Sequence, residues 1–268
     1  MELYKQILDF VDDFNKFRDS DEFKFSLFLK ENRTTITILQ GNYRDLINEF
    51  NYHNNPCFDD IHWHETSKLR WQLHKRIIRV LSNYLSSIFW VVDFSRTHKF
   101  KFLRANDSTL TEIKKIIKRD FQENYEHIFI QDLRDYISHI SFLKPTTIKK
   151  ITAENADVER NLFISKKQLL QSSYKWKSKS KKYIDDQNEE IYVVDLLRTH
   201  HKKFIDFQNL IYVNTVNIHK ELMDTLIMKT EDLYLRGKSL NTAYILPFDL
   251  VYVRYLKYLL NYSAQHSV

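Results

Sequence analysis

Residues 67–94, SKLRWQLHKRIIRVLSNYLSSIFWVVDF, decide the fold class. Apolar residues recur in this stretch about every 3.6 positions over many turns, which is the period of an α-helix with one buried face. A helix of this length is typical of the central member of a helical bundle. The stretch therefore predicts a mainly α-helical protein.

Glycine and proline are scarce, which favours the same fold class. The 268 residues include 2 Gly and 3 Pro, against 43% hydrophobic and 15% aromatic residues. A Rossmann fingerprint or a P-loop needs several glycines in one turn, and Gly41 and Gly237 lie far apart. Sandwiches and barrels need Gly and Pro at many turns, so an all-β fold is disfavoured. Phosphate binding, if present, must use side chains rather than a glycine-rich loop.

The N-terminal region differs from the main body of the chain. Residues 3–18 have the apolar period of a helix, whereas residues 23–39 alternate and contain a β-branched run, which are strand signals. The segment 53–60, with Pro56, indicates a loop. We therefore expect a short α/β accessory segment at residues 1–60, followed by a helical domain at residues 61–268.

The remaining chain predicts helices interrupted by one small β-hairpin. Two strand-like segments, residues 147–152 and 159–164, flank a polar tip, AENAD. The other expected elements are helices at about 109–121, 123–142, 169–176, 190–235 and 248–262.

Composition also indicates the cellular compartment and the kind of partner. The net charge is +6, which tolerates an anionic partner such as nucleic acid. Cys57 is the single cysteine, so no intramolecular disulfide forms and a reducing cytosol fits. The chain begins without the features of a signal peptide and has no run of 18 apolar residues. We expect a cytoplasmic protein with no membrane partner and no cofactor.

Residues 132–139, DLRDYISH, contain the candidate catalytic residues. On the helix predicted for residues 123–142, Arg134, Asp135 and His139 fall on one polar arc, opposite an apolar stripe. Asp135 lies four residues before His139, so its carboxylate can orient the imidazole or raise its pKa. Arg134 and His139 are separated by roughly 7.5 Å along the axis and 140° around it. They can bracket a phosphate lying against the helix, and completion of the site by a second copy is the favoured arrangement.

An Arg-x4-His motif late in a helix of an all-α domain resembles the HEPN superfamily. This superfamily contains nuclease domains of many toxin, abortive-infection and CRISPR-associated proteins. LRDYISH is similar to the LRNYxQH form of one bacterial group, with Asp135 where Asn is usual and Ser138 where Gln is common. Residues 76–96, RIIRVLSNYLSSIFWVVDFSR, resemble the helix preceding that motif, and the resemblance covers roughly residues 60–260.

The resemblance implies a HEPN-like bundle and a metal-independent RNA endonuclease in a bacterial toxin–antitoxin or phage-defence system. His139 would move protons on the 2′-oxygen or the 5′-leaving oxygen, and Arg134 would stabilise the charged phosphate. The products would be a 2′,3′-cyclic phosphate and a 5′-hydroxyl. The implied partners are RNA, a second copy of the chain in a homodimer, and an antitoxin or other regulatory protein.

A non-catalytic module that binds RNA or protein with the same fold is the alternative. Arg and His at this spacing also occur on ordinary solvated helix faces. Loss or retention of RNA cleavage on substitution of Arg134 and His139 separates the two interpretations.

Residues 175–182, KWKSKSKK, form a second candidate site. Its lysines would contact the RNA backbone and its tryptophan would stack on a base. A solvated linker between helices is the alternative interpretation, and we slightly favour it. The candidate RNA-binding residues are Lys175, Trp176, Lys177, Lys179, Lys181 and Lys182.

Two histidine pairs complete the candidates. His62 and His64 share one face if they lie on a strand, but no second ligand cluster accompanies them, so we expect no metal site. His200 and His201 are about 100° apart on a helix and cannot face one point. Because Arg and Lys residues flank this second pair, we expect it to lie on a solvated basic surface.

Overall fold

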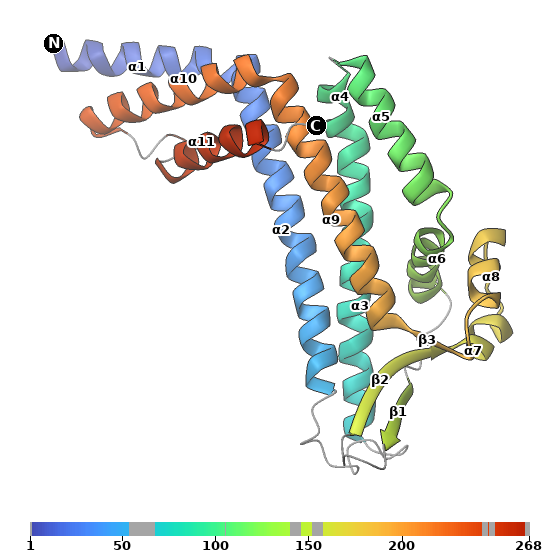
Figure 1. The fold of residues 1–268 in the computed structure, drawn as a ribbon. Coiled ribbons are helices and arrows are strands. Elements are labelled where there is room, and N and C mark those ends of the chain that lie inside the picture. Colours follow the sequence, from blue (N-terminus) through green and yellow to red (C-terminus); the bar gives the residue numbers. More distant parts are fainter. Residues whose placement is uncertain are drawn as a thin grey trace. The chain divides into compact units, whose positions relative to one another are not determined.

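The computed structural model of the chain describes residues 2–53, 68–104, 106–139, 146–151, 158–242, 246 and 250–265. Most of these residues are helical, which confirms the mainly α prediction (Figure 1). The expected helix at residues 67–94 is α3, Lys68–Phe94, and the expected N-terminal helix is α1, Glu2–Arg18. The apolar period therefore predicted both elements correctly.

The strand expected at residues 23–39 is wrong, because these residues belong to one long helix, α2, Asp21–His53. Leu27, within the alternating run, is 42% exposed, whereas Phe25, Phe28 and Leu29 are buried at a helical spacing that continues along α2. Its buried members are Phe25, Phe28, Leu29, Asn32, Thr35, Leu39, Leu46 and Phe50. The described part of the N-terminal segment is thus helical rather than α/β, and residues 54–60 of the expected loop lie outside the described residues.

The described residues divide into two compact units. The first comprises residues 1–34, 94–111 and 207–268. In it α1 packs along α10, Lys220–Ser239, and α10 packs on α11, Leu250–Gln265 (Figure 1). A cluster of aromatic rings centres on Phe28, whose ring lies 4.5 Å from that of Phe102 and 6.1 Å from that of Phe94.

A lysine without exposed surface lies within this first unit. Lys99 ends the π-helical turn η2, Ser95–Lys99, which leads into α4, Phe100–Leu103. Its Nζ donates to Oε1 of Gln208 at 2.5 Å, and the Ser95 hydroxyl donates to the same oxygen at 3.3 Å. Burial lowers the pKa of Lys99 to about 7, because a low-dielectric interior disfavours the charged form.

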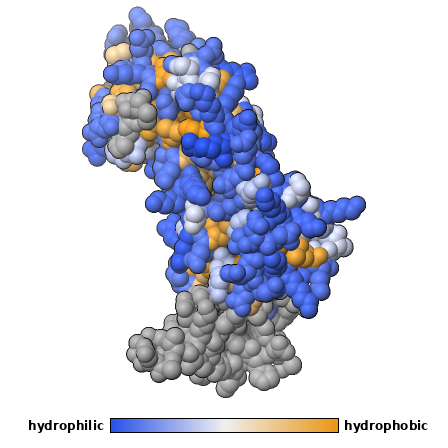
Figure 2. All heavy atoms as spheres, turned by 45° about the vertical axis from the view of Figure 1, so that its right-hand side comes forward, coloured by the Kyte–Doolittle hydropathy of each residue, from blue (hydrophilic) through white to orange (hydrophobic). Residues whose placement is uncertain are grey.

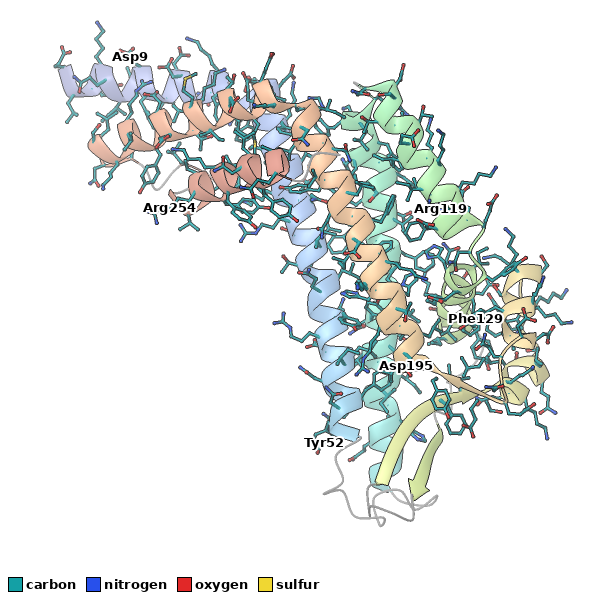
Figure 3. All side chains as sticks on the ribbon, in the orientation of Figure 1. Asp9, Tyr52, Arg119, Phe129, Asp195 and Arg254 are labelled. Atoms are coloured by element: carbon teal, nitrogen blue, oxygen red, sulfur yellow. The ribbon has the colours of Figure 1, made fainter. Side chains whose placement is uncertain are left out.

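The second unit comprises residues 35–93 and 112–206. Its elements include parts of the long helices α2, α3 and α9, Val193–Ile218. The shorter elements are α5, Asp107–Ile117, which begins in the first unit, η3, Lys118–Gln122, α6, Tyr125–His139, α7, Lys166–Gln171, and α8, Ser178–Asp185. The helix α6 packs against α8, with Phe129 between them and its ring 4.8 Å from that of Tyr183 (Figure 3).

The predicted hairpin is present in the second unit. β1, Thr146–Ile151, pairs antiparallel with β2, Val158–Ser165, so that Thr146 lies opposite Phe163. A third antiparallel strand, β3, Glu190–Tyr192, pairs with β2 where a helix was expected. The polar tip AENAD lies outside the described residues.

Hydrophilic side chains cover most of the described surface on the face drawn in Figure 2. One described helical stretch, His74–Leu103, is long and apolar enough to cross a membrane by length and composition. Half of its most apolar 18 residues are buried inside the protein.

Gly41 lies in the interior of α2, and a Cβ atom added there meets nothing within 4 Å. Glycine lowers helix stability because it leaves the unfolded chain more freedom than alanine does. We predict that Gly41→Ala raises the free energy of unfolding by about 0.5–1 kcal/mol in chemical denaturation. An unchanged or lower value would contradict a continuous, unobstructed helix at this position.

The lowered pKa of Lys99 makes the stability of the first unit increase at alkaline pH. Between the folded pKa of about 7 and the ordinary value of 10.5, the unfolded chain binds more protons than the folded chain. Stability therefore rises with pH over this window, by up to about 1.4 kcal/mol per pH unit. We predict that thermal melts of Lys99→Met lack this rise, whereas Lys101→Met, which changes an exposed lysine on α4, retains it.

Candidate functional site

The motif residues lie on α6, and a side chain caps the N-terminus of this helix. The Asn124 side-chain oxygen accepts the backbone N–H of His127 at 3.0 Å and so satisfies a donor that the helix leaves free. Ile130, Leu133 and Ile137 are buried. The predicted apolar stripe is thus confirmed over the described part of α6.

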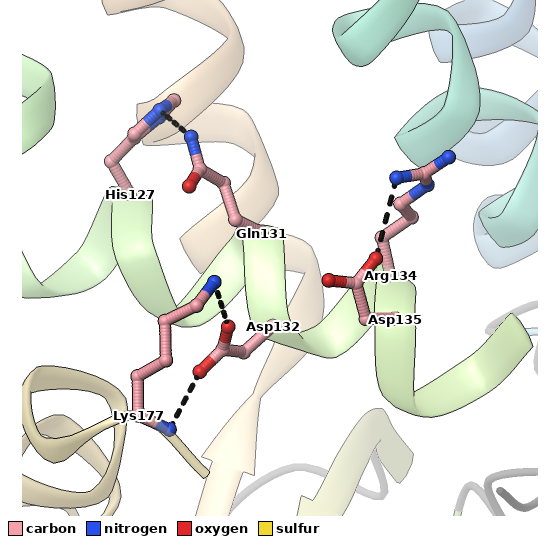
Figure 4. Close-up of polar contacts among 6 residues, drawn as sticks. All are labelled: His127, Gln131, Asp132, Arg134, Asp135 and Lys177. Atoms are coloured by element: carbon pink, nitrogen blue, oxygen red, sulfur yellow. Dashed lines mark hydrogen bonds and ion pairs between the residues drawn. The ribbon is translucent and has the colours of Figure 1, made fainter. Parts of the chain in front are cut away.

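Arg134 projects from α6 toward α3 and is held there by an aromatic ring (Figure 4). Its guanidinium carbon lies 4.2 Å from the centre of the Phe89 ring, and Nη1 lies 3.3 Å from Oδ1 of Asp135. Both charged side chains are 37% exposed. A cation–π contact and an ion pair therefore orient the guanidinium while part of it faces solvent.

His139 is the last residue of α6, and its side chain lies outside the part of the structure that is described. The helix places its backbone five residues beyond Arg134 and one turn beyond Asp135 and Tyr136. The described partner of Asp135 is Arg134. The expected contact between Asp135 and His139 stays a prediction.

Asp132 forms an ion pair with the half-exposed Lys177 on another side of α6, a contact that the sequence did not indicate. Its carboxylate has no exposed surface. Oδ1 lies 2.6 Å from the Lys177 ammonium nitrogen, and Oδ2 accepts the Lys177 backbone N–H at 3.0 Å (Figure 4). Lys177, proposed above as an RNA contact, therefore anchors the start of α8 to the motif helix.

Trp176 packs inside an aromatic cluster that covers α6. Its ring lies 5.3 Å from that of Tyr136 and 5.7 Å from that of Phe129, and its indole N–H donates to the Leu169 carbonyl at 3.0 Å. Burial and the carboxylates of Asp132 and Asp135 raise the pKa of the neighbouring Tyr174 to about 12. The tryptophan thus has structural contacts at the position where the sequence predicted stacking on a base.

The lysines of this segment lie before and on α8, a helix where a linker was the favoured expectation. Lys179 donates to the Gln122 carbonyl at 3.0 Å, and the Lys182 ammonium lies 5.2 Å from the centre of the Tyr125 ring. Lys175 and Lys181 are exposed. Lys175, Lys181 and Lys182 present positive charge to solvent beside the motif helix.

A chain of neutral side chains connects α6 to α9. The Gln131 amide nitrogen lies 2.8 Å from Nε2 of His127, and His127 Nδ1 lies 2.8 Å from Nε2 of His200. Because an amide nitrogen only donates, Nε2 of His127 accepts, and Nδ1–H of His127 donates to His200. Burial lowers the pKa of His127 to about 4 and that of His200 well below its ordinary value.

The solvated surface expected for His200 and His201 is wrong. His200 is only 2% exposed, and His201 stacks on Tyr43 with ring centres 3.6 Å apart. Nδ1 of His201 also lies 3.2 Å from the Tyr84 hydroxyl. The two rings do face different helices, as their angular separation required: His200 faces α6, and His201 faces α2 and α3.

Among the residues that the structure describes, no three His, Cys, Asp or Glu side chains come together to hold a metal ion. His62 and His64 lie outside these residues.

Comparisons with protein-family models, with curated proteins and with solved structures find no match to this chain. The assignment of the motif helix to the HEPN superfamily therefore stays a proposal. The function proposed below rests on the geometry around α6.

The buried histidine pair predicts acid sensitivity of the second unit. The ordinary His pKa is 6.5, and that of folded His127 is about 4. Between these values the unfolded chain binds a proton that folded His127 excludes, so the protein loses stability as the pH is lowered. The loss attributable to His127 is roughly 3 kcal/mol. We predict that chemical denaturation of His127→Gln shows a shallower loss over this range. Substitution of the exposed His98 by Gln should leave the pH profile unchanged, and an unaltered profile in His127→Gln would contradict the assignment.

Proposed function

We propose that this chain is a metal-independent RNA endonuclease of the HEPN type that acts in a bacterial toxin or phage-defence system. The observation that supports it is the setting of Arg134. A permanent cation is oriented by Phe89 and Asp135, is partly exposed, and lies five residues before a histidine at the end of the same helix.

The proposed chemistry uses the 2′-hydroxyl of RNA as the nucleophile. His139 accepts the 2′-hydroxyl proton as the 2′-oxygen bonds to phosphorus, and a protonated imidazole donates a proton to the departing 5′-oxygen. Arg134 stabilises the added charge on the phosphate oxygens, because guanidinium and phosphate form paired hydrogen bonds. The products are a 2′,3′-cyclic phosphate and a 5′-hydroxyl. DNA lacks the nucleophile and is not cleaved.

A homodimer accounts for the separation of the two catalytic groups. Arg134 and position 139 differ by roughly 140° around α6 and 7.5 Å along it, so they face different directions on one helix. A second copy of α6 would bring the Arg134 of one chain toward the His139 of the other. The exposed lysines Lys175 and Lys181 would attract the RNA backbone to this region.

Binding of RNA without cleavage is the second candidate function. The observation that favours it is the ion pair between Arg134 and Asp135. In this pair the carboxylate already offsets the positive charge that would stabilise a phosphate. This candidate keeps the lysine contacts and predicts salt-dependent RNA affinity with no new RNA ends.

Purified protein incubated with total RNA in EDTA tests the proposal. We predict that wild type produces 2′,3′-cyclic phosphate ends, and that Arg134→Ala or His139→Ala lowers the cleavage rate by roughly 10²-fold or more. Arg134→Lys should recover little activity, because an ammonium group does not form the paired contacts of a guanidinium.

Matched controls come from side chains elsewhere in the chain. Arg119 forms an ion pair with the adjacent Asp120, as Arg134 does with Asp135, so Arg119→Ala should retain cleavage. His98→Ala, which removes an exposed histidine, should also retain it. Full cleavage by both motif variants, or cleavage that requires a divalent metal, contradicts the proposal. RNA binding without cleavage by wild type selects the second candidate.

A further inference from the structure

An open cavity of about 530 Å³ lies beside the motif helix, and its described lining residues all belong to the second unit. Its residues come from α6, the end of β2, α7 and the segment after α7. They are Tyr136, Ser165, Lys167, Gln168, Gln171, Ser172 and Ser173. We call it the Tyr136 cavity, and its volume lies in the range that holds small ligands.

Several polar groups in this cavity are free to bind a ligand. The Ser165 hydroxyl accepts the backbone N–H of Gln168, and the Ser172 hydroxyl donates to the Leu169 carbonyl. The lining side chains without a hydrogen-bond partner among the described residues are those of Lys167, Gln168, Gln171 and Ser173. Gln168 and Gln171 are three positions apart on α7 and therefore share one face of that helix.

Tyr136 lies at the base of the cavity and is held in place by neighbouring rings. Tyr136 is 1% exposed, and its ring is held between those of Trp176, at 5.3 Å, and Tyr174, at 5.6 Å. The Trp176 indole is itself fixed by its hydrogen bond to Leu169. Tyr136 is covered by these two rings, so a ligand entering from solvent would meet mainly the polar side chains of α7 and of the segment after it.

We propose that the Tyr136 cavity binds one adenine base of the RNA, next to the bond that is cleaved. A glutamine amide offers one donor and one acceptor, which match the acceptor N7 and donor N6 of adenine. The Lys167 ammonium adds a positive charge suited to a nearby phosphate. An apolar side chain of a protein partner would instead leave these polar groups unpaired.

The place of the cavity on α6 connects it to the proposed chemistry. Tyr136 lies three residues before His139, which is about 4.5 Å along the helix axis and one turn away. A base held at Tyr136 therefore places its own phosphate close to the C-terminal end of α6. The inference rests on the proposed function, because it assigns the cavity to the RNA that the motif helix would cleave.

Binding can be measured apart from cleavage with 2′-O-methyl oligonucleotides, which lack the nucleophile. The probes are fluorescent 2′-O-methyl oligo(A), oligo(U) and oligo(C), followed by anisotropy with the full chain. We expect wild type to prefer oligo(A). The double variant Gln168→Ala/Gln171→Ala should lose roughly tenfold in affinity for oligo(A) and little for oligo(U), since a bidentate base contact contributes about that much.

Gln122→Ala is the matched control, because it removes an exposed glutamine side chain of the same unit away from the cavity. Thermal melts of all variants separate loss of binding from loss of fold. The single variant Gln171→Ala, at an exposed position, should show part of the same selective loss if the double variant is unstable. Free AMP is a further arm, and binding of AMP without binding of oligo(A) would overturn assignment of the cavity to RNA.

The two proposals fail in different ways. Equal affinities for the three oligonucleotides, or an unchanged preference in the stable glutamine variants, overturn the adenine subsite even if Arg134 and His139 prove essential for cleavage. Glutamine-dependent preference for oligo(A) with no cleavage of natural RNA supports the subsite and overturns the nuclease proposal.

Discussion

The buried carboxylate of Asp132 imposes the constraint on which the second unit depends. A carboxylate without exposed surface needs a partner, because burial penalises an unpaired charge. Lys177 meets this need with its ammonium group and its backbone N–H, so the start of α8 is fixed against the middle of α6. The chain just before Lys177 carries Tyr174 and Trp176, and these rings close over Tyr136. One ion pair thus orders the rings that pack on Tyr136 at the base of the cavity.

The motif helix is held on its other sides by contacts of different chemistry. Neutral imidazoles connect His127 to His200 on α9, and a cation–π contact connects Arg134 to Phe89 on α3. His127, Asp132 and Arg134 therefore each contact a different neighbouring segment at a defined distance. Such fixed surroundings suit a site that must hold charged groups in place before a substrate arrives.

Arg134 and Tyr136 project in very different directions, since residues two apart on a helix differ by roughly 200°. A nucleotide in the Tyr136 cavity would therefore lie away from the Arg134 of its own helix and nearer to position 139. Under the proposed function, the guanidinium that completes the site for that nucleotide belongs to the second copy. The proposed function would thus use a second copy both for the cavity and for the separation of Arg134 from His139.

Local periodicity was enough to predict α1, α3, the hairpin and the apolar stripe of α6, because each pattern repeats within a few residues. It was insufficient for residues 23–39, where an alternation typical of a strand overlaps a helical spacing, and only the burial of Phe28 with the exposure of Leu27 separates the two. The burial of His200 beside lysines was also missed, because a covering helix is invisible in a local pattern.

The sequence by itself determined the helical class and which face of the motif helix is apolar, since both depend on neighbouring residues. Only the tertiary structure decided the partner of each polar side chain. Asp132 meets Lys177 across 45 positions of the chain, and His127 meets His200 across 73. Such pairs are set by how helices pack, and no spacing within either segment records them.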